Sequence, residues 1–427
     1  MPDATTHPFD LSDIDGAWTA PIRERAAGFA ALREAPGIPW FEQPPSPVPD
    51  PGPGYYALTR YDEIVEASRA PGVFRSGPGA TSVADMPPAF LEFFGSMINA
   101  DDPRHARLRR IVSRGFTPRR LADLQGSIEQ GAREIVDDLL AAGECEGVET
   151  VSARLPLRTI CDMMGIPASH HRFVYDRSNV ILGAGDPEFV PEGTDVTTAL
   201  LTAGGELAAL MRELGDARRA DPTGDVTSAL VNAEIDGERL TPDELASFFV
   251  LLVVAGNETT RNATSWGLQL LTDHPDQRAA WLADPEGVTA TAVEEIVRWA
   301  SPVIYMRRTL SEPAVLGGTE LPAGAKTALF YWSANRDPAV FGRDGADPEA
   351  FDVRRAPNPH LGFGGPGPHF CLGAHLARRQ LTVLFTELLR RAPRVAVTEE
   401  PRRLRSMFIN GITRLPLTAD AGKAVLA

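Results

Sequence analysis

The segment 241–274, TPDELASFFVLLVVAGNETTRNATSWGLQLLTDH, constrains the fold more than any other part of this chain. The spacing of its apolar residues predicts one long helix. Thr241 is a suitable N-cap, Pro242 suits the first helical position, and Glu244 completes a capping box. The middle of the helix is apolar on every side, so we expect it to be buried all round.

The rest of the chain divides into a helical stretch and a β-rich stretch. Segments from residue 61 to about 298 have mostly helical periodicity, whereas the sequence after Trp299 alternates and turns on Gly-Gly and Pro-Ala-Gly. The stretch 335–370 has little periodicity and precedes a further helix. We therefore expect one mainly α domain over residues 1–427. Its β-rich part should cover roughly 40–75, 300–335 and 395–427, and its helical part roughly 76–299 and 371–394.

Composition limits the partners and the location of the protein. The 427 residues carry a net charge of -15, which argues against nucleic acid or an anionic membrane as the main partner. The longest apolar run, FFVLLVVAG, is far too short to span a bilayer, and the N-terminus resembles no signal peptide. The chain has 3 cysteines, which cannot all pair. The cysteine content favours a reducing, cytoplasmic location, and we expect a monomer.

One cysteine ends a loop that is dense in glycine and proline. Cys371 lies in HLGFGGPGPHFCLG, just before a predicted helix, where unpaired backbone N–H groups favour the thiolate. Such a thiolate could be a nucleophile with His369 as its base, a zinc ligand or a haem ligand. Zinc is the weakest choice, because no second cysteine is near.

FGGPGPHFCLG resembles the haem-binding loop of the cytochrome P450 superfamily, the haem-thiolate monooxygenases, and further motifs resemble that family in order along nearly the whole chain. The resemblance implies the mainly α cytochrome P450 fold, haem b (iron protoporphyrin IX) as cofactor, and Cys371 as the iron ligand. One position departs from the family pattern. Gly364 stands where a phenylalanine is usual, and we expect the preceding Phe363 to shield the sulfur.

Four side chains are expected to hold the haem propionates. DDPRHARLRR resembles the family's propionate-contacting helix, with His105 and Arg109 four residues apart on one face. Arg308 aligns with the family's strand arginine, and its neighbour Arg307 would point the opposite way. His369 is the fourth candidate. Arginine offers a carboxylate a bidentate fork of donors.

A buried polar triad is expected behind the cysteine loop. VEEIVRWASP carries Glu295 and Arg298, and AFDVRRAPNPH supplies Arg355, with Arg354 as the less favoured choice. The resemblance implies that this triad is scaffold. A surface helix pair is the ordinary alternative for such spacing.

The long helix becomes polar at AGNETT, residues 255–260. The stretch resembles the family's acid–alcohol pair, with Glu258 as the acid that relays protons, Thr259 as the alcohol that holds oxygen, and Ala255 beside the cofactor. The alternative is a helix that emerges into solvent at Asn257, but the apolar pattern continues beyond it.

An apolar pocket should receive the substrate. The candidate lining comes from the segment before the His105 helix, three positions of the long helix, the start of a strand and the C-terminal tail. Core packing is almost as good an explanation for each aromatic residue. The candidates are Phe90, Phe93, Phe94, Met97, Leu251, Val254, Ala255, Val303, Ile304, Phe408 and Ile409. We expect an extended hydrophobic substrate, such as a fatty acyl chain, terpenoid or steroid.

Electrons should come from a separate ferredoxin and its reductase. A cluster of arginines near the haem-contacting segments is a candidate docking face for an acidic ferredoxin, and scattered solvated charges are the alternative. The cluster comprises Arg104, Arg107, Arg110, Arg114, Arg119, Arg120, Arg378 and Arg379.

The sequence predicts a monooxygenase that inserts one oxygen atom from O2 into its substrate. Two alternatives compete with it. A peroxygenase or isomerase would not need the Glu258–Thr259 pair, and a non-enzymatic haem sensor would need neither that pair nor an apolar pocket.

Overall fold

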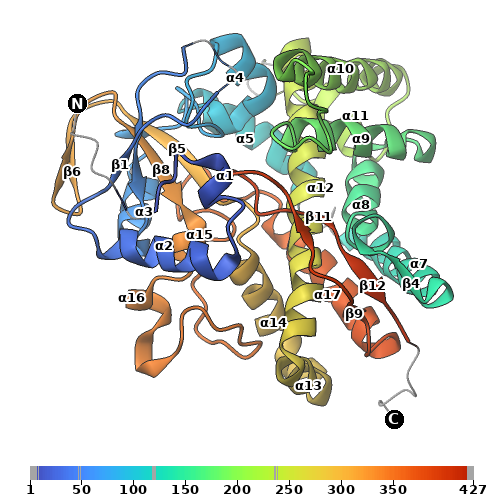
Figure 1. Ribbon diagram of the computed structural model, residues 1–427. Coiled ribbons are helices and arrows are strands. Elements are labelled where there is room, and N and C mark those ends of the chain that lie inside the picture. The colour runs from blue at the N-terminus through green and yellow to red at the C-terminus, as the bar shows by residue number, and fades with distance from the viewer. Residues whose placement is uncertain are drawn as a thin grey trace.

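A computed structural model describes residues 7, 9–46, 48, 50–117, 122–234, 237 and 239–420. Figure 1 shows α12 (Pro242–Asp273) running through the centre of the molecule, with helices on one side of it and the largest sheet on the other. No helix among these residues is long and apolar enough to cross a lipid bilayer.

The long central helix forms as the sequence predicts. The Thr241 hydroxyl accepts the Glu244 N–H, and the Glu244 carboxylate accepts the Thr241 N–H, which completes the capping box. Between residues 245 and 268, the only side chains of α12 that are not buried are Ala255, Gly256 and Thr259. Because these three residues share one helix face, this part of α12 is accessible only along a narrow strip.

Helices surround α12. Those in contact with it include α4, α8, α9, α10, α13, α14 and α17. The bounds on this side are α4 (Pro88–Gly95), α5 (Arg104–Ser113), α7 (Gln125–Ala142), α8 (Arg154–Met164), α9 (His171–Leu182), α10 (Val196–Ala220), α11 (Val226–Val231), α13 (Pro275–Ala283), α14 (Pro285–Ala300) and α17 (Ala374–Arg391).

A five-stranded sheet packs on the other side, with strand order β1-β2-β8-β5-β3. Strand β8 pairs parallel with β2 and antiparallel with β5, so the sheet joins the two ends of the chain. The first two helices of the chain cover it over a core that includes Trp18, Phe29 and Trp332. The bounds are α1 (Ile14–Ala17), α2 (Ile22–Glu34), β1 (Trp40–Phe41), β2 (Tyr55–Leu58), α3 (Tyr61–Arg69), β3 (Phe74–Arg75), β5 (Tyr305–Leu310), β8 (Lys326–Phe330), α15 (Tyr331–Ala334) and α16 (Pro338–Phe341).

The remaining strands form small sheets. The hairpin of β6 (Ala314–Leu316) and β7 (Thr319–Leu321) turns on the expected Gly-Gly pair. β10 (Arg402–Arg403) pairs with β11 (Ile412–Arg414), and β12 (Pro416–Thr418) lies between β9 (Ala396–Val397) and β4 (Glu144–Glu146). β4 falls inside the range expected to be helical. It forms because the C-terminal strand pairs with it, a long-range contact that local periodicity does not reveal.

The segment 183–195, between α9 and α10, is fastened to the C-terminal hairpin. Asp186 is buried, accepts Arg402 Nη2 at 3.1 Å and accepts the Arg405 N–H at 3.0 Å. Arg405 in turn donates to the Gly185 carbonyl at 2.9 Å. A single carboxylate therefore joins two parts of the chain that are far apart in sequence.

Candidate haem-thiolate site

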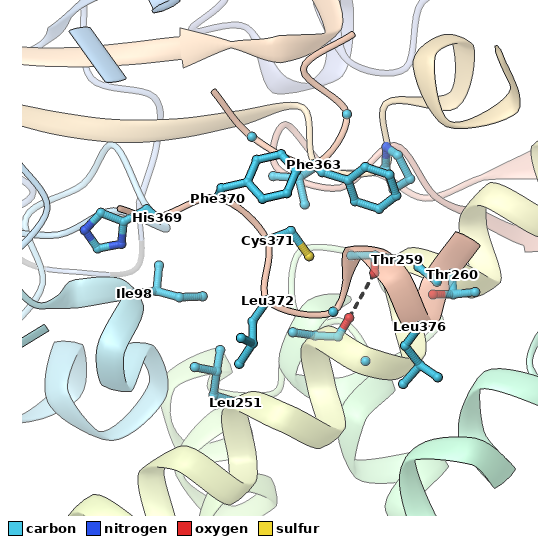
Figure 2. Close-up of a pocket in the computed structure, with 18 of the residues that line it drawn as sticks. Ile98, Leu251, Thr259, Thr260, Phe363, His369, Phe370, Cys371, Leu372 and Leu376 are labelled. Atoms are coloured by element: carbon cyan, nitrogen blue, oxygen red, sulfur yellow. Dashed lines mark hydrogen bonds between the residues drawn. The ribbon is translucent and has the colours of Figure 1, made fainter. Parts of the chain in front are cut away.

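The cavity of interest lies where the cysteine loop faces the open strip of α12. Ala255, Gly256 and Thr259 line it from the helix, and Cys371 lines it from the loop. In Figure 2 the Cys371 sulfur points into the space between the loop and Thr259. The long stretch that lacks periodicity in the sequence therefore forms one wall of a cavity.

Cys371 lies three residues before the first residue of α17. Its backbone N–H donates to the Phe363 carbonyl at 3.0 Å, which closes the loop on itself. Cys371 is exposed toward the cavity, but desolvation by the surrounding protein raises the pKa of its thiol, while the N–H groups of Gly373 and Ala374 and the charges of Arg109 and Arg378 act in the opposite direction. Groups that favour the thiolate therefore surround Cys371, as the sequence predicts. Their combined effect on the pKa is smaller than that of desolvation.

The loop backbone explains the departure at Gly364. Its φ is +90°, a conformation that a phenylalanine would adopt only with strain. Phe363, one residue earlier, lines the cavity instead. In this chain the aromatic ring is thus supplied by the residue before Gly364, where the backbone φ is not positive.

Two other glycines of the loop serve a different contact. A Cβ on Gly365 would lie 2.3 Å from the Ser68 hydroxyl, and a Cβ on Gly367 would lie 2.4 Å from the Ser68 carbonyl. Ser68 belongs to α3, so these glycines allow the loop to pack closely against a helix.

The four propionate candidates gather in the wall of the same cavity. His105, Arg109, Arg308 and His369 all line it, and the rings of His105 and His369 are in contact, with centroids 4.1 Å apart and planes tilted by 35°. Burial, with the charges of Arg308, His105 and Arg109, lowers the pKa of His369 to about 2. His369 is therefore neutral at ordinary pH.

Among the described residues, the acid that pairs with this cluster is Asp102, whose Oδ1 lies 3.5 Å from His105 Nδ1. Neither Arg109 nor Arg308 forms a salt bridge there: Arg109 donates to the Phe370 carbonyl at 2.7 Å, and Arg308 to the Arg307 carbonyl at 2.7 Å. The buried Nε2 of His105 has no hydrogen-bond partner. Orphaned donors around two guanidinium groups fit a ligand that brings carboxylates, as haem does.

Arg307 points the opposite way along β5, as the strand alternation predicts. Its Nη2 lies 2.6 Å from Asp85, and Lys326 on β8 reaches the same carboxylate at 3.3 Å. The two neighbouring arginines therefore serve different purposes. Arg307 ties the sheet to the chain before α4, and Arg308 faces the cavity.

Glu258 and Thr259 lie on different faces of α12. Thr259 lines the cavity, and its hydroxyl donates to the Ala255 carbonyl at 2.9 Å. Glu258 is fully buried outside the cavity lining and forms an ion pair with Arg261, which also donates to Asn179 Oδ1 at 2.6 Å. Burial raises the pKa of Glu258, and the Arg261 charge opposes that effect. The arginine that holds this acid did not figure in the sequence prediction, although its spacing of three residues was visible.

The three residues expected to form a triad meet behind the loop. Arg298 donates to both Glu295 carboxylate oxygens at 2.7 Å, and Arg355 Nε donates to Glu295 at 3.2 Å. Arg354, the less favoured choice, donates instead to the Ala280 carbonyl. Glu295 also accepts the Asp352 N–H at 2.9 Å, so its acceptor sites are well satisfied.

The expected substrate residues divide into two groups. Met97, Leu251, Ala255 and Val303 line the cavity. The other candidates lie outside this lining, namely Phe90, Phe93, Phe94, Val254, Ile304, Phe408 and Ile409.

Packing against other parts of the protein accounts for the positions of most of these residues. Phe93 and Phe94 pack on each other with centroids 4.9 Å apart and cover Gly204 of α10, where a Cβ would lie 2.6 Å from Phe93. Ile304 belongs to the core under the sheet, and the Phe408 ring packs on Tyr305 at 5.6 Å.

Sequence reasoning missed several apolar residues of the lining, among them Ile98, Ile160, Leu252, Val297, Met306 and Leu376. They come from six different elements or connecting segments, and only the packing of those elements brings them together. Spacing from Cys371 could have indicated Leu376 alone, one turn into the helix that follows the loop.

Several arginines of the candidate docking face pair with acidic or polar side chains, which reduces the net positive charge of that face. Arg104 pairs with Glu92 at 2.5 Å, Arg107 pairs with Glu244, and Arg378 pairs with Glu294 at 2.5 Å. Arg379 donates to Gln125. Arg119 and Arg120 lie outside the described residues, as does the side chain of Arg114.

Known proteins resemble this chain over almost its full length. The family model for Cytochrome P450 matches residues 288–412. A methyl-branched lipid omega-hydroxylase of Mycobacterium tuberculosis is 47% identical over 420 residues, which cover 98% of this chain and 96% of that protein. The chain belongs to the cytochrome P450 family.

Two further relatives agree with this membership. A steroid C26-monooxygenase of Rhodococcus jostii is 37% identical over 97% of this P450 and 86% of that protein. A Mycobacterium marinum cytochrome P450, solved in complex with pseudoionone, is 40% identical with a TM-score of 0.90, over 97% of this chain and 100% of that one. The predicted family, mainly α fold and monooxygenase class are confirmed, and the family implies a haem-thiolate cofactor.

Proposed function

We propose that this P450 hydroxylates the terminal carbon of a methyl-branched lipid. One oxygen atom of O2 enters the product, and the other leaves as water with two electrons and two protons. A separate ferredoxin and its reductase supply the electrons, and haem b is the cofactor. The observation that carries the proposal is the 47% identity to the methyl-branched lipid omega-hydroxylase over 98% of the chain.

The residues of the cysteine loop and its surroundings would hold the cofactor. Cys371 would supply the iron ligand, and His105, Arg109, Arg308 and His369 would bind the propionates. The bound haem supplies the iron at which O2 is activated. The protein's own contribution is to fix the thiolate, neutralise the carboxylates and exclude water.

Thr259 and Glu258 would have separate roles in delivering protons to the cavity. The Thr259 hydroxyl faces the cavity and can hold a water by a hydrogen bond. Glu258 would relay protons from solvent to that site. Its carboxylate lies outside the lining, so delivery requires it to leave Arg261 or to act through water.

The cavity favours the apolar end of the substrate. Its apolar lining includes aliphatic and thioether side chains such as Leu251, Val297, Val303 and Met306, and its charged residues are those of the propionate cluster. A polar headgroup would lose hydrogen bonds there, whereas a branched methyl end would not. The headgroup would thus remain outside, and oxidation would occur at the far end of the chain.

A substrate screen on the purified holoprotein tests this function. A methyl-branched fatty acid should give a larger low-to-high-spin Soret shift than the straight-chain acid with the same carbon number. With ferredoxin, reductase and 18O2, the product should carry one labelled oxygen at the terminal carbon. A response to steroids alone would contradict the lipid assignment, and label arriving only from peroxide would indicate a peroxygenase.

A further inference from the structure

Arg378 lies directly behind the aromatic residue of the cysteine loop. It belongs to α17, and its guanidinium carbon is 4.4 Å from the centroid of the Phe363 ring. The Phe363 carbonyl accepts the backbone N–H of Cys371 at 3.0 Å. Arg378 therefore contacts the residue that contacts Cys371.

Glu294 of α14 fixes the guanidinium in this place. Arg378 Nε and Nη2 donate to the two oxygens of Glu294 at 2.5 and 2.8 Å, which is a bidentate pair. Such a pair sets the plane of the guanidinium, and a defined plane is what stacking on a ring requires. A lysine could keep the charge but neither the fork nor the stacked plane.

His360 joins the loop to the same carboxylate. Its Nε2 lies 2.9 Å from Glu294, and its Nδ1 accepts the Gly362 N–H at 3.1 Å. Because Nδ1 is an acceptor, Nε2 carries the hydrogen and donates it to Glu294. The His360 and Phe363 rings are also in contact, with centroids 5.8 Å apart.

Glu294 is thus the common anchor of α14, α17 and the loop. The left-handed backbone at Gly364 disfavours a side chain there, so on this side of the loop Phe363 supplies the ring that lines the cavity with Cys371. The ring is held from behind by Arg378 and from one side by His360, both of which depend on Glu294.

We propose that Arg378 is a positioning residue for the iron-ligand loop: fixed by Glu294, it holds the Phe363 ring beside Cys371 and thereby protects the thiolate bond to iron. The proposal rests on the proposed role of Cys371 as the iron ligand. Arg378 touches neither cofactor nor substrate in this scheme and acts through Phe363.

Spectra and potentials of the purified holoprotein test the idea. Ferrous protein with CO should show a far-red Soret band when the thiolate is bound and a shorter-wavelength band when it is protonated or lost. R378K and E294Q should raise the shorter-wavelength fraction several-fold over the wild type. R390K is the matched control, because Arg390 on the same helix pairs with Glu387 at 2.7 Å, outside the cavity lining, and should leave the spectrum unchanged.

The reduction potential of the iron distinguishes the effect of the Arg378 charge from the effect of its stacking on Phe363. R378Q removes a positive charge near the sulfur and should make the iron harder to reduce, whereas R378K should keep the wild-type potential but still show the raised shorter-wavelength fraction. In an F363L background, R378K should add nothing, because the ring that it positions is gone.

Two results would overturn the proposal: unchanged CO spectra in both R378K and E294Q, or an R378K effect of the same size in the F363L background. If R378K loaded no haem, E294Q would still decide the matter, since it leaves the guanidinium present. A wild-type protein without any far-red CO band would instead refute the role of Cys371 itself, which is part of the proposed function.

Discussion

Glu258 and Arg261 lie three residues apart on α12 and form an ion pair in which both side chains are at most 2% exposed. The neighbouring Thr259 faces the cavity, so a single turn of the helix carries both a cavity-facing hydroxyl and a fully buried acid. In the proposed function, this arrangement would keep a proton-carrying acid close to the cavity without placing a charge among apolar substrate atoms.

The first prediction concerns that acid. Glu258→Gln should lower product formation by about 10²-fold, since a positioned acid–base group typically contributes this much. The substrate-induced Soret shift should persist, because Glu258 does not line the cavity. Steady-state turnover and substrate titration of the same preparation check both outcomes. A turnover unchanged within twofold would remove Glu258 from the proton path.

The second prediction concerns the pH dependence of Arg261→Gln. Without the arginine charge, burial should raise the pKa of Glu258 still further. The folded state then binds the proton more tightly than the unfolded chain, whose carboxyl titrates at about 4.3. The stability is therefore fully present at low pH and is lost as pH rises through the folded pKa.

Thermal unfolding at two pH values measures this effect. Arg261→Gln should lose about 3 kcal/mol relative to the wild type at pH 8, and clearly less at pH 5. The double variant with Glu258→Gln should lack the pH dependence, because no carboxyl remains to titrate. A single variant equally destabilised at both pH values would contradict the assignment.

The third prediction concerns the buried triad. Glu295 is 0% exposed and accepts from both Arg298 and Arg355. Glu295→Gln leaves two buried guanidiniums without a counter-charge and should cost about 3–5 kcal/mol in the free energy of unfolding. Urea unfolding measures the loss, with Glu286→Gln at the start of the same helix as the surface control.

The fourth prediction concerns the backbone at Gly364. Gly364→Ala should destabilise the holoprotein by about 1–2 kcal/mol, because its φ of +90° is strained for any residue with a Cβ. Gly126→Ala is the matched control. Gly126 lies in α7, and a Cβ at that position would have nothing within 4 Å, so alanine should stabilise the protein by about 0.5–1 kcal/mol. Equal effects of the two substitutions would contradict the argument.

The fifth prediction concerns the fastening of residues 183–195. Asp186→Asn weakens the bonds to Arg402 and to the Arg405 backbone, so this segment should open more often. Limited proteolysis should then cut within the segment several-fold faster. Asp216→Asn removes an exposed pair with Arg219 on α10 and should leave the cleavage rate unchanged.

The sequence predicts the elements better than it predicts the cavity. The central helix and its capping box depend on local spacing, and both lie where the pattern of residues 241–274 places them. The aromatic residues of α4 look equally suited to a pocket, yet they cover Gly204 of α10. That choice depends on the distance between two helices, which no local pattern encodes. The strand β4 was missed for the same reason, since it pairs with β12 near the opposite end of the chain.

Gly365 and Gly367 fit against Ser68 of α3, and their requirement for glycine arises from that helix. The shape of the loop is thus fixed in part by contacts between protein segments, before any cofactor arrives. Haem would enter a partly built frame instead of organising a loose loop, which lowers the entropy lost on binding. The same two glycines that identify a cofactor loop in the sequence are required, in the folded chain, by close packing against a neighbouring helix.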